Sequence, residues 1–351
     1  MRKVLVLLFV LVLIGFSTVL FAGGAKEVDK AKIKIGLSLG TLQQERWVQE
    51  RDMMLDYIKK NYPDVELLVQ AADSDATKQV AQAENLLVQG ANVLIVVPQD
   101  AEASGVIVKN AHLANVPVIA YDRMITNVDT DLYVSFDSVR VGEMMTNYAL
   151  ERVPKGNYVI LKGGPSDNNA HLVYEGQMKA LKPYVDRGDV KIVADQWCDN
   201  WSPEEALKHT ENALTATNNN IDAILTGWDG LSQAAIQAIS AQGLAGKVLV
   251  TGQDADLSAC QAIIAGTQTM TIYKPLKELA EVGIDAAIAL AKGEKISYSG
   301  TVNNNFKDVP AVMPNIYPVD IDNIDDVVIR SGFRTVEDVY RNVPKSQWPK
   351  L

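Results

Sequence analysis

The feature that most restricts the fold of this chain is a repeated alternation of short apolar, β-branched runs with longer stretches of helical periodicity. The apolar runs cover residues 33–37, 65–69, 93–97, 116–121 and 132–136, and in a second round 158–161, 190–193, 221–225 and 248–250. Helical stretches follow most of them, among others residues 45–62, 77–89 and 101–113. Strands and helices in alternation are typical of parallel βαβ units, so we expect an α/β protein with parallel sheets.

Two rounds of the alternation predict two domains, which also fits the length of the chain. About 325 of the 351 residues remain after the leader described below, and a domain usually holds roughly 100–200 residues. No Ser/Gly-rich linker separates the two rounds, and we place their join near Asp137 and Ser138. Residues 303–318 are polar and contain three prolines, which favours a connecting segment. Residues 331–351 are polar and aromatic and are interpreted as a surface tail.

The first 25 residues have the pattern of a secretory signal peptide. Met1-Arg2-Lys3 is basic, residues 4–14 are apolar, and small residues follow around position 22. The apolar run is shorter than the ~20 residues that a membrane-spanning helix needs. We therefore expect export to the periplasm or another extracytoplasmic space, with cleavage after Ala22 or after Ala25. A lipid anchor is not expected, because there is no cysteine near the cleavage site.

The charge of the chain argues against nucleic acid as a partner. The sequence has 43 acidic and 33 basic residues, a net charge of −10, and a phosphate backbone attracts the opposite balance. The two cysteines, Cys198 and Cys260, are too few for a disulfide framework. Whether they pair or remain buried free thiols stays open at this stage.

Motifs of the common enzyme classes are missing from the sequence. It contains no G-x-x-x-x-G-K-[ST] phosphate loop, no H-E-x-x-H zinc helix and no G-x-S-x-G elbow. The acidic stretch 320–326 lacks the central glycine and closing glutamate of a calcium loop and is interpreted as a solvated turn. We expect no enzymatic activity, no cofactor and no metal site. A glycoside-acting enzyme remains as an alternative, because carboxylates occur among the clusters described next.

Short polar clusters stand near the ends of the apolar runs. They are 45–47, 122–123, 167–169, 197–201, 228–229, 253–254 and 273–274. The carboxyl ends of the strands in an open α/β sheet face one crevice, so these side chains are expected to converge on one small ligand. Arginines, carboxylates, amides and indoles suit an uncharged, polyhydroxylated molecule, which needs fixed hydrogen-bonding groups and flat apolar walls.

Longer strings within the chain resemble the periplasmic D-xylose-binding proteins of sugar ABC importers, within the ribose/galactose/xylose type. The strings that carry the resemblance are 45–47, 121–124, 167–170, 176–179, 182–186, 240–247 and 252–256. The resemblance covers nearly all of the chain after the leader. It implies the type I periplasmic binding protein fold, with two Rossmann-like lobes joined by three crossing segments near Asp137, Tyr273 and Asn305. The lobes would then comprise residues 31–137 with 275–305, and residues 138–274 with 306–330.

The same resemblance implies a set of ligand-binding residues in the cleft between the lobes. They are Arg46, Trp47, Asp122, Arg123, Asp167, Asn169, Trp201, Trp228, Asp254 and Lys274. The arginines and the lysine would donate to sugar hydroxyls, the aspartates would accept from them, and the indoles of Trp47 and Trp201 would lie against the sugar ring. Two alternatives stay open: Asp122 or Asp254 serves only to orient a neighbouring arginine, and Asp167 and Asn169 cap a helix, which is compatible with a place in the cleft.

Trp228 departs from the family pattern, which has an asparagine at this position. An indole offers one N–H and much more bulk than an amide, so the identity of the sugar is left open. We predict a monosaccharide-binding protein, with D-xylose favoured and glucose, ribose, arabinose or galactose as alternatives. The expected partner is an ABC transporter permease, and a chemotaxis receptor is an alternative partner. Sugar-responsive repressors share this core, but they carry a DNA-binding helix-turn-helix where this chain has a leader.

Overall fold

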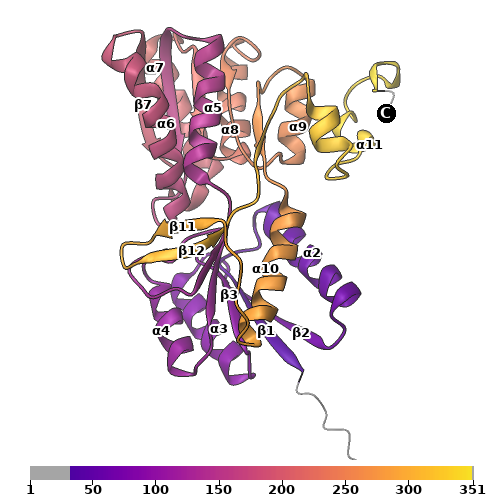
Figure 1. The fold of residues 1–351 in the computed structure, drawn as a ribbon. Helices are drawn as coiled ribbons and strands as arrows, with labels where there is room; N and C mark the ends of the chain where they lie inside the picture. Colours follow the sequence, from indigo (N-terminus) through magenta and orange to yellow (C-terminus); the bar gives the residue numbers. More distant parts are fainter. Residues whose placement is uncertain (1–31, 350–351) are drawn as a thin grey trace, which may run out of the picture. The chain divides into compact units, whose positions relative to one another are not determined.

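The computed structural model describes residues 32–349, so the expected signal peptide lies outside the described residues. The structure is an α/β fold with two separate parallel-dominated sheets, each covered by helices (Figure 1). The predicted α/β class and the parallel pairing of the strands are confirmed.

The first lobe is built on a seven-stranded sheet with the order β11-β12-β5-β4-β3-β1-β2. All its neighbouring strands are parallel except the pair β11 and β12. Its strands are β1 (Ile33–Leu39), β2 (Val65–Ala71), β3 (Val93–Val97), β4 (Val118–Tyr121), β5 (Leu132–Val134), β11 (Gly300–Asn303) and β12 (Asp308–Val312). Its helices are α2 (Glu45–Asn61), α3 (Ala76–Val88), α4 (Gly105–Leu113) and α10 (Leu276–Ala291).

The second lobe is built on a four-stranded parallel sheet with the order β7-β6-β8-β9. Its strands are β6 (Gly156–Lys162), β7 (Val190–Trp197), β8 (Ala223–Thr226) and β9 (Leu249–Val250), and a separate antiparallel pair is formed by β10 (Thr271–Tyr273) and β13 (Tyr317–Val319). Its helical segments are α5 (Ser138–Arg152), α6 (Asn168–Asp186), η1 (Asp199–Trp201), α7 (Pro203–Thr217), α8 (Asp229–Ala241), α9 (Leu257–Ile264), η2 (Asp325–Ile329), α11 (Val336–Val339) and η3 (Lys345–Gln347).

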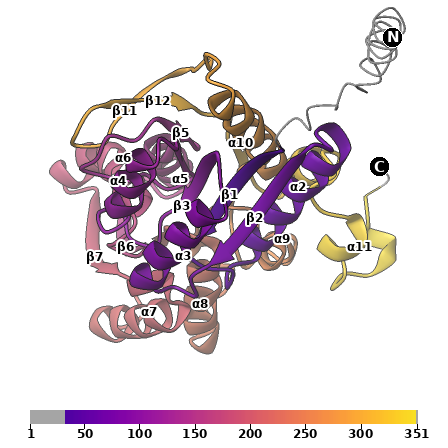
Figure 2. The same cartoon turned by 90° about the horizontal axis from the view of Figure 1, so that it is seen from below.

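The inner strands β3, β4 and β8 are buried on both faces, which explains why they are nearly continuous apolar runs. In the first lobe, α2 and α10 lie on one face of the sheet and α3 and α4 on the other (Figure 2). Ile35 and Ile95 belong to the core shared with α2 and α10, whereas Leu94 and Val96 belong to the core shared with α3 and α4. Side chains alternate between the faces of a strand, so one five-residue run supplies both cores. The second lobe repeats this plan, with α7 and α8 on one face of its sheet and α5 and α6 on the other.

Two predictions about the end of the chain were wrong. Residues 308–312 form β12, which pairs with β5 in the first sheet, so this segment does not belong to the second lobe. The chain returns to the second lobe only between β12 and β13, which lies beyond Asn305. The sequence did not predict these strands, because proline is rare within strands and Pro310 lies within β12 and Pro318 within β13. Residues 331–349 are not a free surface tail either, since Val339 and Tyr340 are buried against α9.

The structure settles the state of the two cysteines. Cys198 and Cys260 are free and buried, and they lie in different hydrophobic clusters of the second lobe. Burial raises the pKa of the Cys198 thiol to about 12, and that of Cys260 also lies above its usual value. No helix within residues 32–349 is long and apolar enough to cross a membrane. Within the same residues, no group of three or more His, Cys, Asp or Glu side chains is arranged to hold a metal ion.

Candidate ligand-binding site

One polar cavity collects all ten residues that the sequence pointed to. Its lining consists of Gln44, Arg46, Trp47, Asp122, Arg123, Asp167, Asn169, Trp201, Trp228, Gln253, Asp254 and Lys274. The structure therefore brings the predicted residues together, and their role in ligand binding stays a prediction. Sequence reasoning missed Gln44 and Gln253. The position of Gln253 beside Asp254, in one of the polar clusters at the strand ends, was a usable signal for it.

The lining residues stand where strands of both lobes end. Arg46 is the second residue of α2, which follows β1, and Arg123 follows β4, so both come from the first lobe. Asp167 precedes α6 after β6, and Trp228 stands between β8 and α8 in the second lobe. Lys274 follows β10, directly before the chain returns to the first lobe as α10. Parallel strands thus deliver their following residues to one crevice, as expected for open α/β sheets.

Three lining residues adopt a left-handed backbone conformation, which is unfavourable for residues other than glycine. Asp122 has φ +59°, Trp201 has φ +59° and Asp254 has φ +97°. Backbone hydrogen bonds hold all three, since the N–H of Asp122 donates to Val134 O at 2.7 Å, that of Trp201 to Cys198 O at 2.9 Å and that of Asp254 to Ile272 O at 2.8 Å. Such strain commonly marks functional sites, where it aims a side chain that a relaxed loop would place elsewhere.

Arg46 is the centre of a buried ion network. Its Nη2 lies 2.6 Å from Asp122 Oδ2, its Nε donates to Glu50 Oε1 at 2.9 Å, and its Nη1 lies 3.3 Å from Asp254 Oδ1. Glu50 stands one helical turn after Arg46, the spacing at which side chains of a helix meet. Burial acts to lower the pKa of Arg46, but the three carboxylates outweigh it and hold this pKa well above its usual value. The guanidinium is thus fixed and charged before any ligand arrives.

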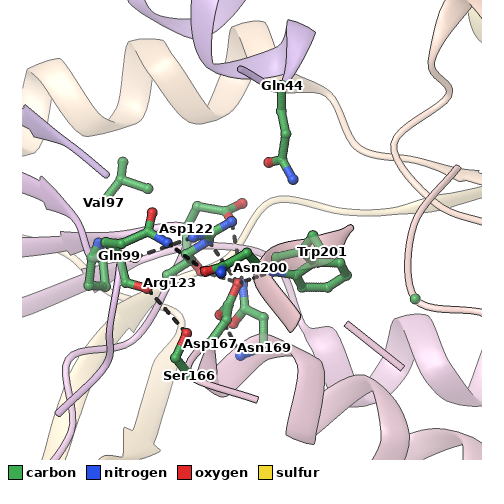
Figure 3. A network of polar contacts seen from close by, with 12 residues as sticks. Gln44, Val97, Gln99, Asp122, Arg123, Ser166, Asp167, Asn169, Asn200 and Trp201 are labelled. Carbon is green, nitrogen blue, oxygen red and sulfur yellow. Dashed lines mark hydrogen bonds and ion pairs between the residues drawn. The ribbon is translucent and has the colours of Figure 1, made fainter. Parts of the chain in front are cut away.

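Several contacts across the cavity join the two lobes. Arg123 Nε lies 2.7 Å from Asp167 Oδ2, and Asn169 Nδ2 donates to the backbone oxygen of Asp122 at 2.9 Å (Figure 3). Burial raises the pKa of Asp167, while the charge of Arg123 opposes this rise. Asp167 also accepts from the amide of Asn169, which confirms its place at the N-terminus of α6. The helix cap and the cavity lining are therefore the same residues.

Figure 3 also shows Gln99 of the first lobe beside Asn200 and Ser166 of the second. Gln99 Nε2 lies 3.5 Å from Asn200 Oδ1, and Ser166 Oγ donates to Gln99 O at 3.5 Å. The backbone N–H of Ala101 also donates to Ser166 O, at 2.9 Å. The two lobes are therefore in contact both through the ion pairs in the cavity and through these additional hydrogen bonds.

Asp254 joins the second lobe to two cations. Its Oδ1 lies 2.9 Å from Lys274 Nζ and 3.3 Å from Arg46 Nη1. Burial acts to raise the pKa of Asp254, but the two cations more than offset it and hold this pKa below its usual value. The carboxylate is therefore ionised at neutral pH and available as a hydrogen-bond acceptor.

Indole rings supply the apolar surfaces of the cavity. Trp47 packs under the arginines, with the guanidinium carbon of Arg46 4.3 Å from its ring centre. Trp201 is nearly buried and lies on Gly163, where a Cβ would come within 2.2 Å of its ring. Trp228 is half-buried and lies across Gly230 in the same manner, with 2.2 Å between its ring and an added Cβ. Glycine at these two positions leaves the space that the indoles occupy.

Asp229 supports the site without lining the cavity. Its carboxylate accepts from Gln268 Nε2 at 2.8 Å, from Thr271 Oγ1 at 2.9 Å and from the amide of Asp256 at 3.0 Å. It therefore ties the start of α8, next to Trp228, to β10 and to the loop after Asp254. Burial raises its pKa well above the usual value, and the nearby carboxylate of Asp256 adds to this rise.

The charges of the cavity are nearly compensated. Arg46, Arg123 and Lys274 stand against Asp122, Asp167 and Asp254, and Glu50 lies behind them. A balanced set of donors and acceptors between indole walls matches a neutral molecule with many hydroxyl groups better than an ion. One acceptor, Gln253 Oε1, is buried without a hydrogen-bond partner among residues 32–349.

Residues 35–295 match the periplasmic binding protein domain family. The chain belongs to this family. This periplasmic binding protein is 43% identical over 330 residues to the D-xylose-binding periplasmic protein of Haemophilus influenzae, covering 94% of this chain and 98% of the relative. It is 45% identical over 312 residues to the D-xylose-binding periplasmic protein of Escherichia coli, with 89% and 92% covered. These relatives are solute-binding proteins of the periplasm.

Solved structures show the same fold in other sugar-binding members. A carbohydrate transporter solute-binding protein from Chloroflexus aurantiacus in complex with D-glucose superposes with a TM-score of 0.82 at 30% identity, covering 87% of this chain and 97% of that one. An ABC transporter solute-binding protein from Clostridium phytofermentans with bound β-D-glucose gives a TM-score of 0.81 at 29% identity, with 87% and 99% covered. The expected type I periplasmic binding protein fold is thereby confirmed.

Proposed function

We propose that the protein binds a monosaccharide, D-xylose, in the extracytoplasmic space and delivers it to the permease of an ABC importer. The sugar is held between the lobes, and no covalent bond is made or broken. The similarity to two D-xylose-binding periplasmic proteins over most of the chain supports the choice of sugar.

The observation that carries the proposal is that donors and acceptors from both lobes pair directly across one cavity. Arg123 meets Asp167 across it, and Arg46 meets Asp254. A sugar hydroxyl placed among these groups would hydrogen bond to both lobes at once, which is possible only when the lobes are together. A ligand shifts a hinge equilibrium by its differential affinity for the two states, so contacts of this kind favour the closed form.

Glucose is the principal alternative, and Trp228 is the residue that would distinguish the two sugars. Structurally similar proteins have been solved with glucose bound. A pyranose of xylose differs from that of glucose by the absence of the exocyclic hydroxymethyl group. The half-buried indole of Trp228 lines the cavity and narrows it, so we expect it to disfavour the larger sugar.

Isothermal titration calorimetry of the protein without residues 1–25 tests the proposal against xylose, glucose, ribose, arabinose and galactose. We expect the tightest binding with xylose. Tightest binding of another of these sugars would refute xylose but keep the binding function, and binding of none would refute both. The absence of free aglycone after incubation with aryl xylosides would agree with a binding protein, whereas its release would favour a glycoside-acting enzyme.

A Trp228→Asn variant tests the reason given for the selectivity. We expect the ratio of glucose affinity to xylose affinity to rise, because the indole no longer limits the cavity. An unchanged ratio of the two affinities would show that Trp228 does not determine which sugar is bound.

A further inference from the structure

The segment after η2 packs on the second lobe and also reaches the first. Val339 and Tyr340 anchor it in a cluster with Cys260 and Ile263 of α9. Phe333 packs against this cluster and also against the core of the first lobe. Its ring centre lies 4.9 Å from that of Tyr273, at the end of β10. The segment thus touches both lobes beside one of the strands that connect them.

Arg334 makes a polar bridge at the same place. Its Nη1 lies 2.6 Å from Glu45 Oε1 of the first lobe. Its Nη2 and Nε donate to the backbone oxygen of Ala255 in the second lobe, at 3.2 Å and 3.4 Å. The Arg334 side chain is only 8% exposed, whereas that of Glu45 is 47% exposed. One nearly buried cation therefore holds a group from each lobe.

The two residues that Arg334 holds are direct neighbours of the ligand site. Glu45 is the first residue of α2 and precedes Arg46 and Trp47, which line the cavity. Ala255 follows Asp254, which also lines it. Arg334 and Glu45 themselves do not line the cavity. Whatever Arg334 contributes to binding must act through the position of these two loops.

We propose that Arg334 is a positioning residue which clasps Glu45 when the lobes are together and so favours the closed form. The inference rests on the proposed function, because it concerns how the same site retains its sugar. The contacts with Ala255 lie within the second lobe and persist when the lobes part. Among these contacts of Arg334, only the ion pair with Glu45 is lost when the lobes open. This pair therefore contributes to closure and to ligand retention.

The size of the effect follows from the exposure of the pair. Ion pairs at exposed positions add little to the stability of the state in which they form. Because Arg334 is largely shielded from water, we place this pair at the upper end of the energies of exposed pairs. We expect loss of the pair to weaken sugar affinity by about two- to fivefold. The association rate should change little and the dissociation rate should rise, because the contact forms after the sugar has entered.

The test is a double-mutant cycle with Arg334→Met, Glu45→Gln and the double variant in the protein without residues 1–25. Methionine keeps the length of the arginine stem, and glutamine keeps the shape of the glutamate. Sugar affinity and dissociation rate are measured by calorimetry and stopped-flow fluorescence. Arg341→Met is the matched control, since Arg341 forms its ion pair with Asp338 inside the same segment, at 2.8 Å, and not with a residue of the first lobe.

A second readout follows closure without relying on a sugar. Fluorophores on Val88→Cys in the first lobe and Lys182→Cys in the second report the distance between the lobes by energy transfer, and the two native cysteines are buried. Both single variants should lower the closed fraction of the sugar-free protein, and the double variant should lower it no further than either single one.

The proposal is overturned if the Arg334→Met effect persists in full in the Glu45→Gln background, or if neither variant changes dissociation rate or closed fraction. If Arg334→Met does not fold, Glu45→Gln alone must show the faster dissociation. If no tested sugar binds, the proposed function fails, while the change in closed fraction still decides the role of Arg334.

Discussion

Replacement of Arg123 by alanine should weaken sugar binding strongly while leaving the sugar-free protein folded. Arg123 is 5% exposed, and its Nε lies 2.7 Å from Asp167 Oδ2 of the other lobe. A hydrogen bond to a charged group contributes about 1.5–3 kcal/mol. At about 1.4 kcal/mol per factor of ten, loss of one such bond to the sugar corresponds to a 10- to 150-fold weaker affinity.

The fold should tolerate this change because the ion pair joins two lobes. Removal of one partner of a buried pair within a single core costs about 3–5 kcal/mol, since the remaining charge stays buried. Here the pKa of Asp167, which burial already raises, would rise further, and the carboxylate can also regain water when the lobes part. The free energy of unfolding, measured with urea, should therefore change by much less than that amount.

Calorimetry and urea unfolding of the same preparation test this reasoning, with Arg140→Ala as control. Arg140 is 55% exposed and pairs only with Glu143, at 3.4 Å, so its loss removes the same charge away from the site. An affinity within threefold of the original would refute the role of Arg123. A loss of unfolding free energy near 3–5 kcal/mol would show that the pair stabilises the fold rather than closure.

Two further predictions follow from the walls and the carboxylates of the site. Gly163→Ala should weaken sugar binding in calorimetry, because an added Cβ would lie 2.2 Å from the Trp201 ring and displace it, and unchanged affinity would show that Trp201 is not a wall of the site. Burial, helped by the charge of Asp254, raises the pKa of Asp256 to about 7. The folded protein therefore holds a proton between about pH 4 and pH 7 that the unfolded chain releases, and stability falls as pH rises through this window. Asp256→Asn should raise the Tm at pH 8 and leave it nearly unchanged at pH 4, and an equal effect at both pH values would contradict this assignment.

Local patterns were sufficient for most of the fold. The runs at 33–37, 65–69 and 93–97 became β1, β2 and β3, and the continuous apolar sequence of β3 reflects its burial on both faces. The polar residues after each run were equally readable, because parallel strands end at one edge whatever the details of packing. All ten residues expected to bind ligand line one cavity for this reason.

Elements whose formation depends on residues far away in the sequence could not be predicted from the sequence. β12 is a strand because β5 and β11 lie beside it, and its own residues include a proline. Glu50 stands one helical turn after Arg46, but its contact with Tyr121 joins residues 71 positions apart. No local sequence pattern predicts a contact over such a separation.

The amino-acid sequence was enough to establish the α/β class, the order of strands and helices up to about residue 250, and which residues would gather at the ligand site, because periodicity and strand ends are local properties. The return of residues 308–312 to the first sheet, the ion pairs that join the lobes through Arg46 and Arg123, and the reach of Arg334 to Glu45 became visible only in three dimensions. These features depend on the packing of segments up to 289 residues apart, which is decided by burial and charge pairing across the whole folded chain.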